Sequence, residues 1–139
     1  MAVAQDQLEL SVAEDVAAAV VDVRRAFGEY VVHAWPDGSQ GAYVVIDELN
    51  LGSFWKPATS WLGFIISYLH PDADCYPHHI RGDVLRADEK PLTAPFNANS
   101  NFAGITSVMI SRSSPRRRKD ADTPALNRSS PYRFSRYCL

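Results

Sequence analysis

The chain has 139 residues, of which 46% are hydrophobic and 22% are charged, and its formal net charge is −2. This length and composition favour a single domain with one hydrophobic core. Because there is no long apolar run and no basic-then-apolar start, we expect a protein that is neither membrane-spanning nor secreted. Two cysteines, Cys75 and Cys138, are too few for a disulfide framework and fit a reducing cytosol, so a cytoplasmic location is expected.

Charge is distributed unevenly along the chain. Residues 1–110 carry 14 acidic and 6 basic side chains, whereas residues 111–139 carry 2 acidic and 8 basic ones. The basic end is either a solvated tail or a binding segment for an acidic partner. We divide the chain into a flexible leader at 1–10, a folded domain at 11–126 and a basic tail at 127–139.

The first predicted element is a helix that begins after residue 11. Ser11 and Glu14 have the spacing of a capping box, in which each side chain bonds the other residue's backbone amide. Apolar residues then recur at helical spacing, at positions 12, 16, 20, 23 and 27. Gly28 is expected to end the helix in a left-handed conformation.

Three strand-like segments follow, at residues 29–34, 41–50 and 61–68. Residues 36–38 predict a turn, and 61–68 is apolar enough to be buried on both faces. Prolines and an asparagine-rich run predict a loop over 81–102. Alternating apolar residues over 102–111 predict a fourth strand. Residues 122–126 could begin a short helix. The expected fold class is α+β, with an N-terminal helix packed on an antiparallel four-stranded meander.

Histidines gather in the segment that follows the third predicted strand. His70 precedes a proline, which favours an extended backbone and a fixed side-chain direction. It is either a functional imidazole or a histidine that hydrogen-bonds the loop backbone. His78 and His79, if they lie in a strand, point to opposite faces and cannot bind one metal together. We expect neither a metal nor a cofactor.

Two residues with nucleophilic side chains, Cys75 and Ser111, stand apart from these histidines. Cys75 is the nucleophile by residue type. Its neighbours Asp72 and Asp74 disfavour the thiolate, so the alternative role is that of a small buried hydrophobe. Ser111 closes the fourth predicted strand beside Arg112 and, taken alone, is a cap or a polar surface residue.

The order of these segments resembles the ubiquitin-conjugating-enzyme fold. Three stretches stand where eukaryotic members have His-Pro-Asn, Gly-x-Ile-Cys and Trp-Ser-Pro-Ala-Leu: Leu69-His-Pro-Asp72, Gly104–Ser111 and Asp122-Thr-Pro-Ala-Leu126. The blocks at 68–74, 76–88 and 108–112 look like bacterial ubiquitin-conjugating-like proteins, which are encoded with ubiquitin-like modifiers and activating-enzyme-like partners. The resemblance covers residues 28–126.

The resemblance implies a protein that receives a ubiquitin-like modifier from an adenylating, activating-enzyme-like partner. Asp72 replaces the asparagine of the family, and no cysteine lies in residues 104–114. The implied acyl acceptor is therefore Ser111, which would form an oxyester, and Cys75 is the less favoured acceptor. His70 or His78 would act as the base, and Arg112 would steady the developing oxyanion.

Two functions therefore remain open from the sequence. One is a transferase that carries the modifier covalently, and the other is a binding module of the same fold that holds a ubiquitin-like protein without turnover. A third interpretation, a nucleic-acid binder, would use residues 116–136. That stretch has few aromatics for a stacking groove, so we do not expect a nucleic-acid partner. The lack of a long apolar run argues against a membrane partner.

Overall fold

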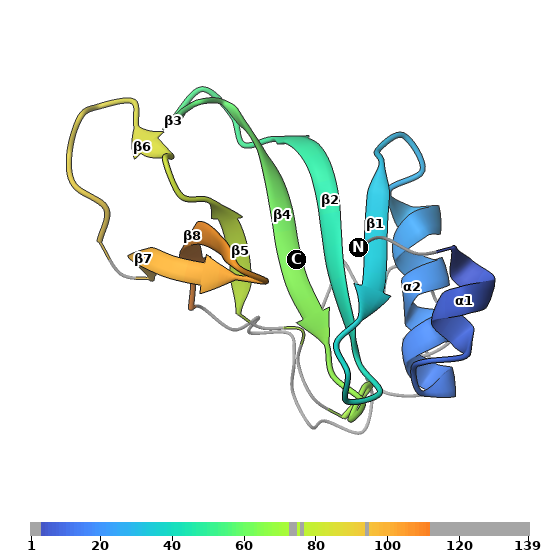
Figure 1. Ribbon diagram of the computed structural model, residues 1–139. Helices are drawn as coiled ribbons and strands as arrows, with labels where there is room; N and C mark the ends of the chain where they lie inside the picture. The colour runs from blue at the N-terminus through green and yellow to red at the C-terminus, as the bar shows by residue number, and fades with distance from the viewer. Residues whose placement is uncertain (1–3, 73–74, 76, 94, 112–139) are drawn as a thin grey trace, which may run out of the picture.

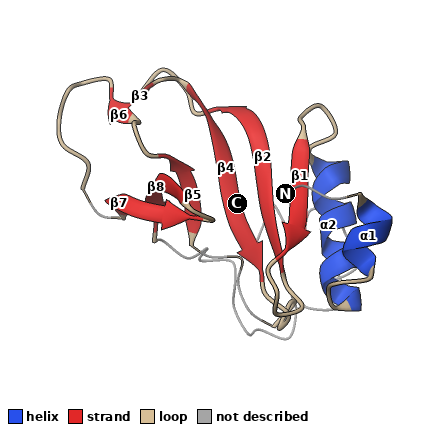
Figure 2. Ribbon diagram, viewed as in Figure 1, coloured by secondary structure: helices blue, strands red, loops and turns tan. Residues whose placement is uncertain are grey.

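The computed structural model describes residues 4–72, 75, 77–93 and 95–111, which form two helices followed by antiparallel sheets (Figures 1 and 2). This arrangement is α+β. Helix α1 spans Gln5–Glu9 and helix α2 spans Glu14–Ala26, and both contact strand β1 at Val32–Pro36. None of the helices in the described residues has the length and apolar character that a bilayer crossing requires.

A six-stranded antiparallel sheet and a separate two-stranded sheet follow the helices. The large sheet has the strand order β1-β2-β4-β5-β8-β7, and the small one pairs β3 with β6. The remaining strands are β2 Ala42–Asn50, β3 Trp55–Lys56, β4 Thr59–Ile66, β5 His78–Arg81, β6 Leu85–Arg86, β7 Phe96–Phe102 and β8 Ile105–Ile110.

The start of α2 differs from the predicted capping box. Its N-cap is Ala13 rather than Ser11, and no side chain caps this end. The preceding residue, Val12, forms an isolated bridge with Gln40, and the amide of Ala13 donates to the carbonyl of Gln40 over 2.9 Å. The chain before α2 is therefore bonded to the turn between β1 and β2, and this tertiary contact replaces the local cap.

Two further features of the N-terminal region differ from expectation. Helix α2 ends with Phe27 as its C-cap, and Gly28 is not in the left-handed region. The leader expected at 1–10 contains helix α1, and Leu8 of this helix is fully buried. Since Leu8 belongs to the main core, residues 5–9 are part of the folded domain.

The first three predicted strands are confirmed as β1, β2 and β4, with ends shifted by a few residues. The turn at 36–38 is also confirmed. Gly38 has a φ of 87°, and the Asp37 carboxylate accepts hydrogen bonds from the amides of Ser39 and Gly41. Gly38 therefore takes the positive φ expected of it, whereas Pro36 is the last residue of β1 and pairs with Ala42.

The predicted four-stranded meander differs from the observed sheet in two respects. The fourth predicted strand exists as β8, but β5 lies between it and β4. The segment 81–102 is not a loop throughout, because β7 pairs with β8 as a hairpin. Its two-residue turn is Ala103–Gly104, with φ values of 51° and 86°, and such turns match the twist of paired strands. The carboxamide of Asn101 accepts from the amide of Gly104.

Alternate residues of the large sheet face two different environments, because side chains alternate across a strand. The inner face packs against the helices and the small sheet. Its main cluster joins strand residues such as Val44 and Phe64 to helix residues such as Val16 and Val20. A smaller cluster around Ile80, Val84 and Val108 continues the core beyond β4, with Trp55 and Phe96 packed against it.

The outer face carries an aromatic cluster centred on Phe102, a residue of β7. Its ring lies 5.6 Å from that of Tyr43 in β2 and 6.0 Å from that of Trp61 in β4, and Tyr43 stacks on Trp35. Strands β4, β5 and β8 separate β2 from β7, a spacing of about 19 Å in a flat sheet. The sheet must therefore curl, which makes its outer face concave.

The curl also requires a glycine in β4. A Cβ atom added at Gly63 would lie 2.7 Å from Cε2 of Phe102, closer than non-bonded carbon atoms approach. Gly63 thus leaves the space that the Phe102 ring fills.

Candidate functional site

The His70–Pro71 segment forms a tight turn after β4. The amide of His70 donates to the carbonyl of Ser67 over 2.9 Å, and the amide of Asp72 donates to the carbonyl of Leu69 over 2.8 Å. His70 is 7% exposed. The structure thus places the motif directly after the apolar strand, as the sequence indicates, but in a turn rather than in the extended segment expected before proline.

Cys75 lies in the main core, where it is 1% exposed. It is also disulfide-bonded rather than a free thiol, unlike the reduced cysteine expected in a reducing cytosol. In this state Cys75 has no thiolate with which to attack an acyl carbon, because the thiolate is the nucleophilic form. Its burial agrees with the alternative prediction of a small buried hydrophobe.

Ser111 is held by the segment that leads into β7. Its hydroxyl donates to the carbonyl of Pro95 and accepts from the Asn97 carboxamide, each over 3.1 Å, and its own amide donates to the same carbonyl over 2.9 Å. Neither partner is a base at neutral pH. Arg112 lies outside the described residues, as do the helix expected at 122–126 and the tail at 127–139.

The two histidines of β5 lie on opposite faces of the sheet, as predicted. His78 faces inward, with its ring edge-on to Phe64 at 5.7 Å. Burial, together with the nearby His79, lowers its pKa to about 4. His78 pairs with Ile110, so Ser111 and His78 project from opposite faces. The structure therefore does not bring the Ser111 hydroxyl to this imidazole.

His79 faces outward and forms a contact that sequence reasoning missed. Its Nδ1 lies 2.8 Å from the hydroxyl of Ser107, and its ring lies 5.0 Å from that of Phe102. Burial lowers the pKa of His79. Ser107 is completely buried, so this serine–histidine pair cannot meet an acyl donor without a structural change. His79 and Ser107 are 28 positions apart, so no local sequence pattern predicts that they form a pair.

The described residues bring together no group of three or more histidine, cysteine or acidic side chains that could bind a metal ion. They do form an open groove of about 960 Å³ at one end of the outer face. Its lining comes from β2, β4, β5 and β8 and from the residues that flank them. The residues important below are Asp47, Glu48, Trp61, Arg81, Asp83 and Ile105.

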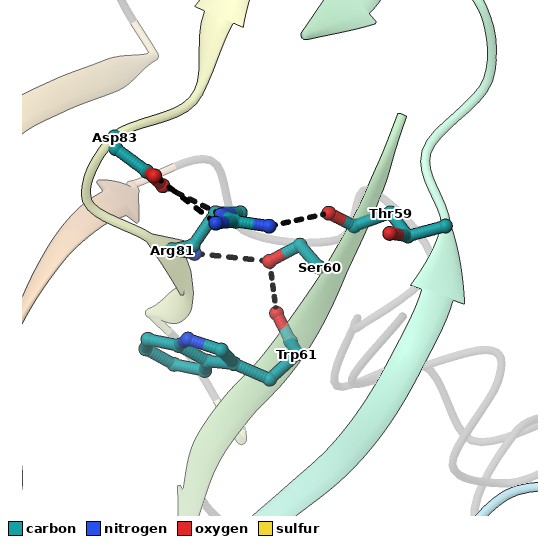
Figure 3. Close-up of polar contacts among 5 residues, drawn as sticks. All are labelled: Thr59, Ser60, Trp61, Arg81 and Asp83. Carbon is teal, nitrogen blue, oxygen red and sulfur yellow. Dashed lines mark hydrogen bonds and ion pairs between the residues drawn. The ribbon is translucent and has the colours of Figure 1, made fainter. Parts of the chain in front are cut away.

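Arg81 is fixed in this groove by several hydrogen bonds (Figure 3). Its Nε and Nη2 donate to the two carboxylate oxygens of Asp83, and Nη1 reaches the carbonyl of Thr59. The hydroxyl of Ser60 accepts from the amide of Arg81 over 3.0 Å and donates to the carbonyl of Trp61 over 2.6 Å. The hydrogen bonds with Asp83 raise the pKa of Arg81 and lower that of Asp83.

A β-bulge in β2 shapes the opposite wall of the groove. The register with β4 shifts between Ile46 and Leu49, and Glu48 has a φ of 57°. Bulges of this kind often redirect side chains beside functional sites. Asp47 on the same bulge bonds His33 Nε2 over 2.8 Å. The sequence shows no turn residue at Glu48, so neither the bulge nor the groove was predicted.

Comparison with family models, with curated proteins and with solved structures finds no match to this chain. The candidate sites therefore rest on the geometry of the chain itself.

Proposed function

We propose that this chain binds a ubiquitin-like modifier non-covalently, as a binding module that works beside an adenylating, activating-enzyme-like protein. Two features support the proposal. One is the His70–Pro71 turn, which follows an apolar strand as it does in the motif order on which the resemblance rests. Asp72 in this turn offers a charge in place of the amide donor that an oxyanion needs.

The observation that carries the non-covalent form of the proposal is the state of the two candidate acyl acceptors. The Ser111 hydroxyl bonds a carbonyl and a carboxamide, and Cys75 is buried and disulfide-bonded. Serine needs a neighbouring base to act as a nucleophile near neutral pH. Since neither acceptor is activated in the described structure, holding a modifier is better supported than transferring one.

The proposal is tested first by identifying the neighbouring genes and then with their products. We expect genes for a ubiquitin-like protein and an adenylating protein beside this one. The purified modifier should bind the chain saturably in calorimetry, and binding should not require ATP. Incubation with the modifier, the adenylating protein and ATP should leave no covalent adduct after denaturation.

Each alternative outcome identifies a different function. A base-labile, thiol-stable adduct that disappears in Ser111→Ala would establish oxyester transfer, the catalytic alternative. A thiol-labile adduct that forms in the reduced protein and is lost in Cys75→Ala would make Cys75 the acceptor. Absence of both binding and adduct would contradict the proposal in either form.

A further inference from the structure

We propose that the groove on the outer face binds an extended peptide segment of a partner protein, with a lysine or arginine side chain placed against Glu48 and Trp61. This inference goes beyond the proposed function and does not depend on it, because any partner with an accessible basic segment could supply the ligand. It rests on the shape, the charge and the apolar walls of the groove.

The shape favours an extended ligand. The volume of about 960 Å³ lies at the upper end of the range for ligand sites. The groove crosses several strands, from Glu48 in the bulge of β2 to Ile105 at the start of β8. It lies on the concave face of the curled sheet and is open to solvent. A peptide backbone can lie along such a groove and turn one side chain toward its floor.

The charge favours a cation. Among the described residues, three carboxylates and the Arg81 guanidinium line the groove. Asp83 forms two parallel hydrogen bonds with Arg81, and Asp47 is bonded to His33. Glu48 is exposed, and no hydrogen bond or ion pair engages it within the described part of the chain. Within the described residues, Glu48 therefore gives the groove a negative charge without an ion-pair partner, which would repel a phosphate backbone and attract a cation.

The apolar walls suit a long basic side chain. Val31 and Ile105 line the groove and are 59% and 50% exposed, and Trp61 adds an aromatic surface. Lysine and arginine bury their aliphatic stems on such surfaces while the charged group stays in contact with water. A cation beside an indole gains further from the ring quadrupole. A small metal ion would use neither contact.

The binding partner is taken to be another protein rather than the chain's own basic run at 116–119. A peptide segment of another protein binds and dissociates as a separate molecule. A synthetic peptide added to the full chain should therefore bind reversibly. The probe is the synthetic peptide Gly-Arg-Gly-Lys-Gly with both ends blocked. Its neutral counterpart carries citrulline and acetyl-lysine in place of the basic residues.

We expect saturable binding to the full 139-residue chain, followed by backbone and indole chemical shifts in NMR. The largest shifts should map to Trp61, Arg81 and Ile105, and added salt should weaken binding by screening the charges. The neutral peptide should bind several-fold more weakly. Shifts that map elsewhere, or equal binding of the two peptides, would overturn the proposal.

A matched pair of variants isolates the charge. Glu48 and Glu89 are both exposed glutamates at positive φ, 57° and 65°, but Glu48 alone of the two lines the groove. Glu48→Gln should weaken peptide binding about two- to fivefold, the usual range for an exposed ion pair. Glu89→Gln should leave it unchanged. Equal effects of the two substitutions would show non-specific attraction and would overturn the proposal.

A third variant tests occupation by the chain itself. Replacing Arg116, Arg117, Arg118 and Lys119 with glutamine removes the basic run. If the peptide binds this variant and the parent chain equally, the ligand comes from a partner. If it binds the variant alone, the chain's own basic segment occupies the groove, and the proposal of a partner's peptide is overturned.

Discussion

The inner and outer faces of one sheet are built from different kinds of residue. The inner face is largely aliphatic and is covered by α1, α2 and the small sheet. The outer face is aromatic at its centre, around Phe102, and polar at the end where the groove lies. The aliphatic face can stabilise the domain by burial alone, whereas the groove that we propose for peptide binding lies on the concave face.

This difference also explains where the candidate nucleophiles lie. Cys75 belongs to the inner core, and Ser111 lies at the far end of β8 from the groove. Neither Cys75 nor Ser111 is among the residues that line the groove beside Glu48. Binding on the outer face and acyl transfer at Ser111 would therefore use separate parts of the molecule.

The largest expected effect tests the structural role of the inner face. Phe64 is completely buried against the helices. Phe64→Ala should lower the free energy of unfolding by about 3–5 kcal/mol, because it removes a large apolar side chain and leaves a cavity. The measurement is urea unfolding followed by circular dichroism. Phe54→Ala is the control: Phe54 is 53% exposed, and its loss should cost less than about 1 kcal/mol.

The next effect concerns a titratable group on the inner face. Burial lowers the pKa of His78 to about 4 in the folded state, against 6.5 for the ordinary side chain. Below pH 6.5 the unfolded chain binds a proton that folded His78 does not. The stability that neutral, buried His78 contributes is therefore fully present above pH 6.5. It is lost progressively as the pH falls towards 4.

Lowering the pH from about 7.5 to about 4.5 should cost about 2–3 kcal/mol through His78 alone, since each pKa unit corresponds to about 1.4 kcal/mol. His78→Leu cannot take up the proton, so its unfolding free energy should fall by correspondingly less over the same interval. Urea titrations of both proteins at the two pH values measure this difference. Equal losses would mean that His78 is solvated in the folded state.

A smaller effect tests the packing of the outer face. Gly63→Ala would place a Cβ against the Phe102 ring, which Tyr43, Trp61 and His79 hold in position. We expect a loss of about 1–3 kcal/mol from overpacking.

A double-mutant cycle identifies the cause of that loss. Gly63→Ala should cost less in a Phe102→Leu background, because the smaller side chain leaves room for the new methyl group. Gly28→Ala is the control, since its Cβ would make an ordinary contact of 3.6 Å with the carbonyl of Arg25. Additive costs at Gly63 and Phe102 would contradict the close approach.

The parts of the fold that the sequence predicts are those with a local signal. Alternating or continuous apolar residues mark β1, β2 and β4, and the helical spacing of valines marks α2. The strand β7 has the opposite character, because Asn97–Asn101 is typical of a loop. It becomes a strand through pairing with β8 and through the Ala103–Gly104 turn.

The candidate groove has no local signal at all. Glu48, Trp61 and Arg81 come from three strands and meet because the sheet curls. The curl depends on the contact of Phe102 with Gly63, which are 39 positions apart in the sequence. Ser111 and Cys75 were predicted as acyl acceptors from their residue types and from the resemblance. Neither kind of reasoning could predict the hydrogen bonds of the Ser111 hydroxyl or the burial of Cys75.

The smallest effect distinguishes the groove from the rest of the surface by means of two similar ion pairs. Arg81 with Asp83 and Arg86 with Asp88 are both arginine–aspartate pairs two residues apart, each joined by two hydrogen bonds, but only the first lies in the groove. Neither Arg81→Gln nor Arg86→Gln should change the urea midpoint measurably, because exposed ion pairs contribute little to stability.

Binding of the cationic peptide should separate the two arginine variants. Arg81→Gln leaves the Asp83 carboxylate uncompensated inside the groove, so the peptide should bind about two- to fivefold more tightly. Arg86→Gln should leave the affinity unchanged. Titration calorimetry of the two variants, side by side, provides the measurement. Weaker binding by the Arg81 variant would mean that its guanidinium positions the groove for its ligand, and that rigidity outweighs charge on the concave face.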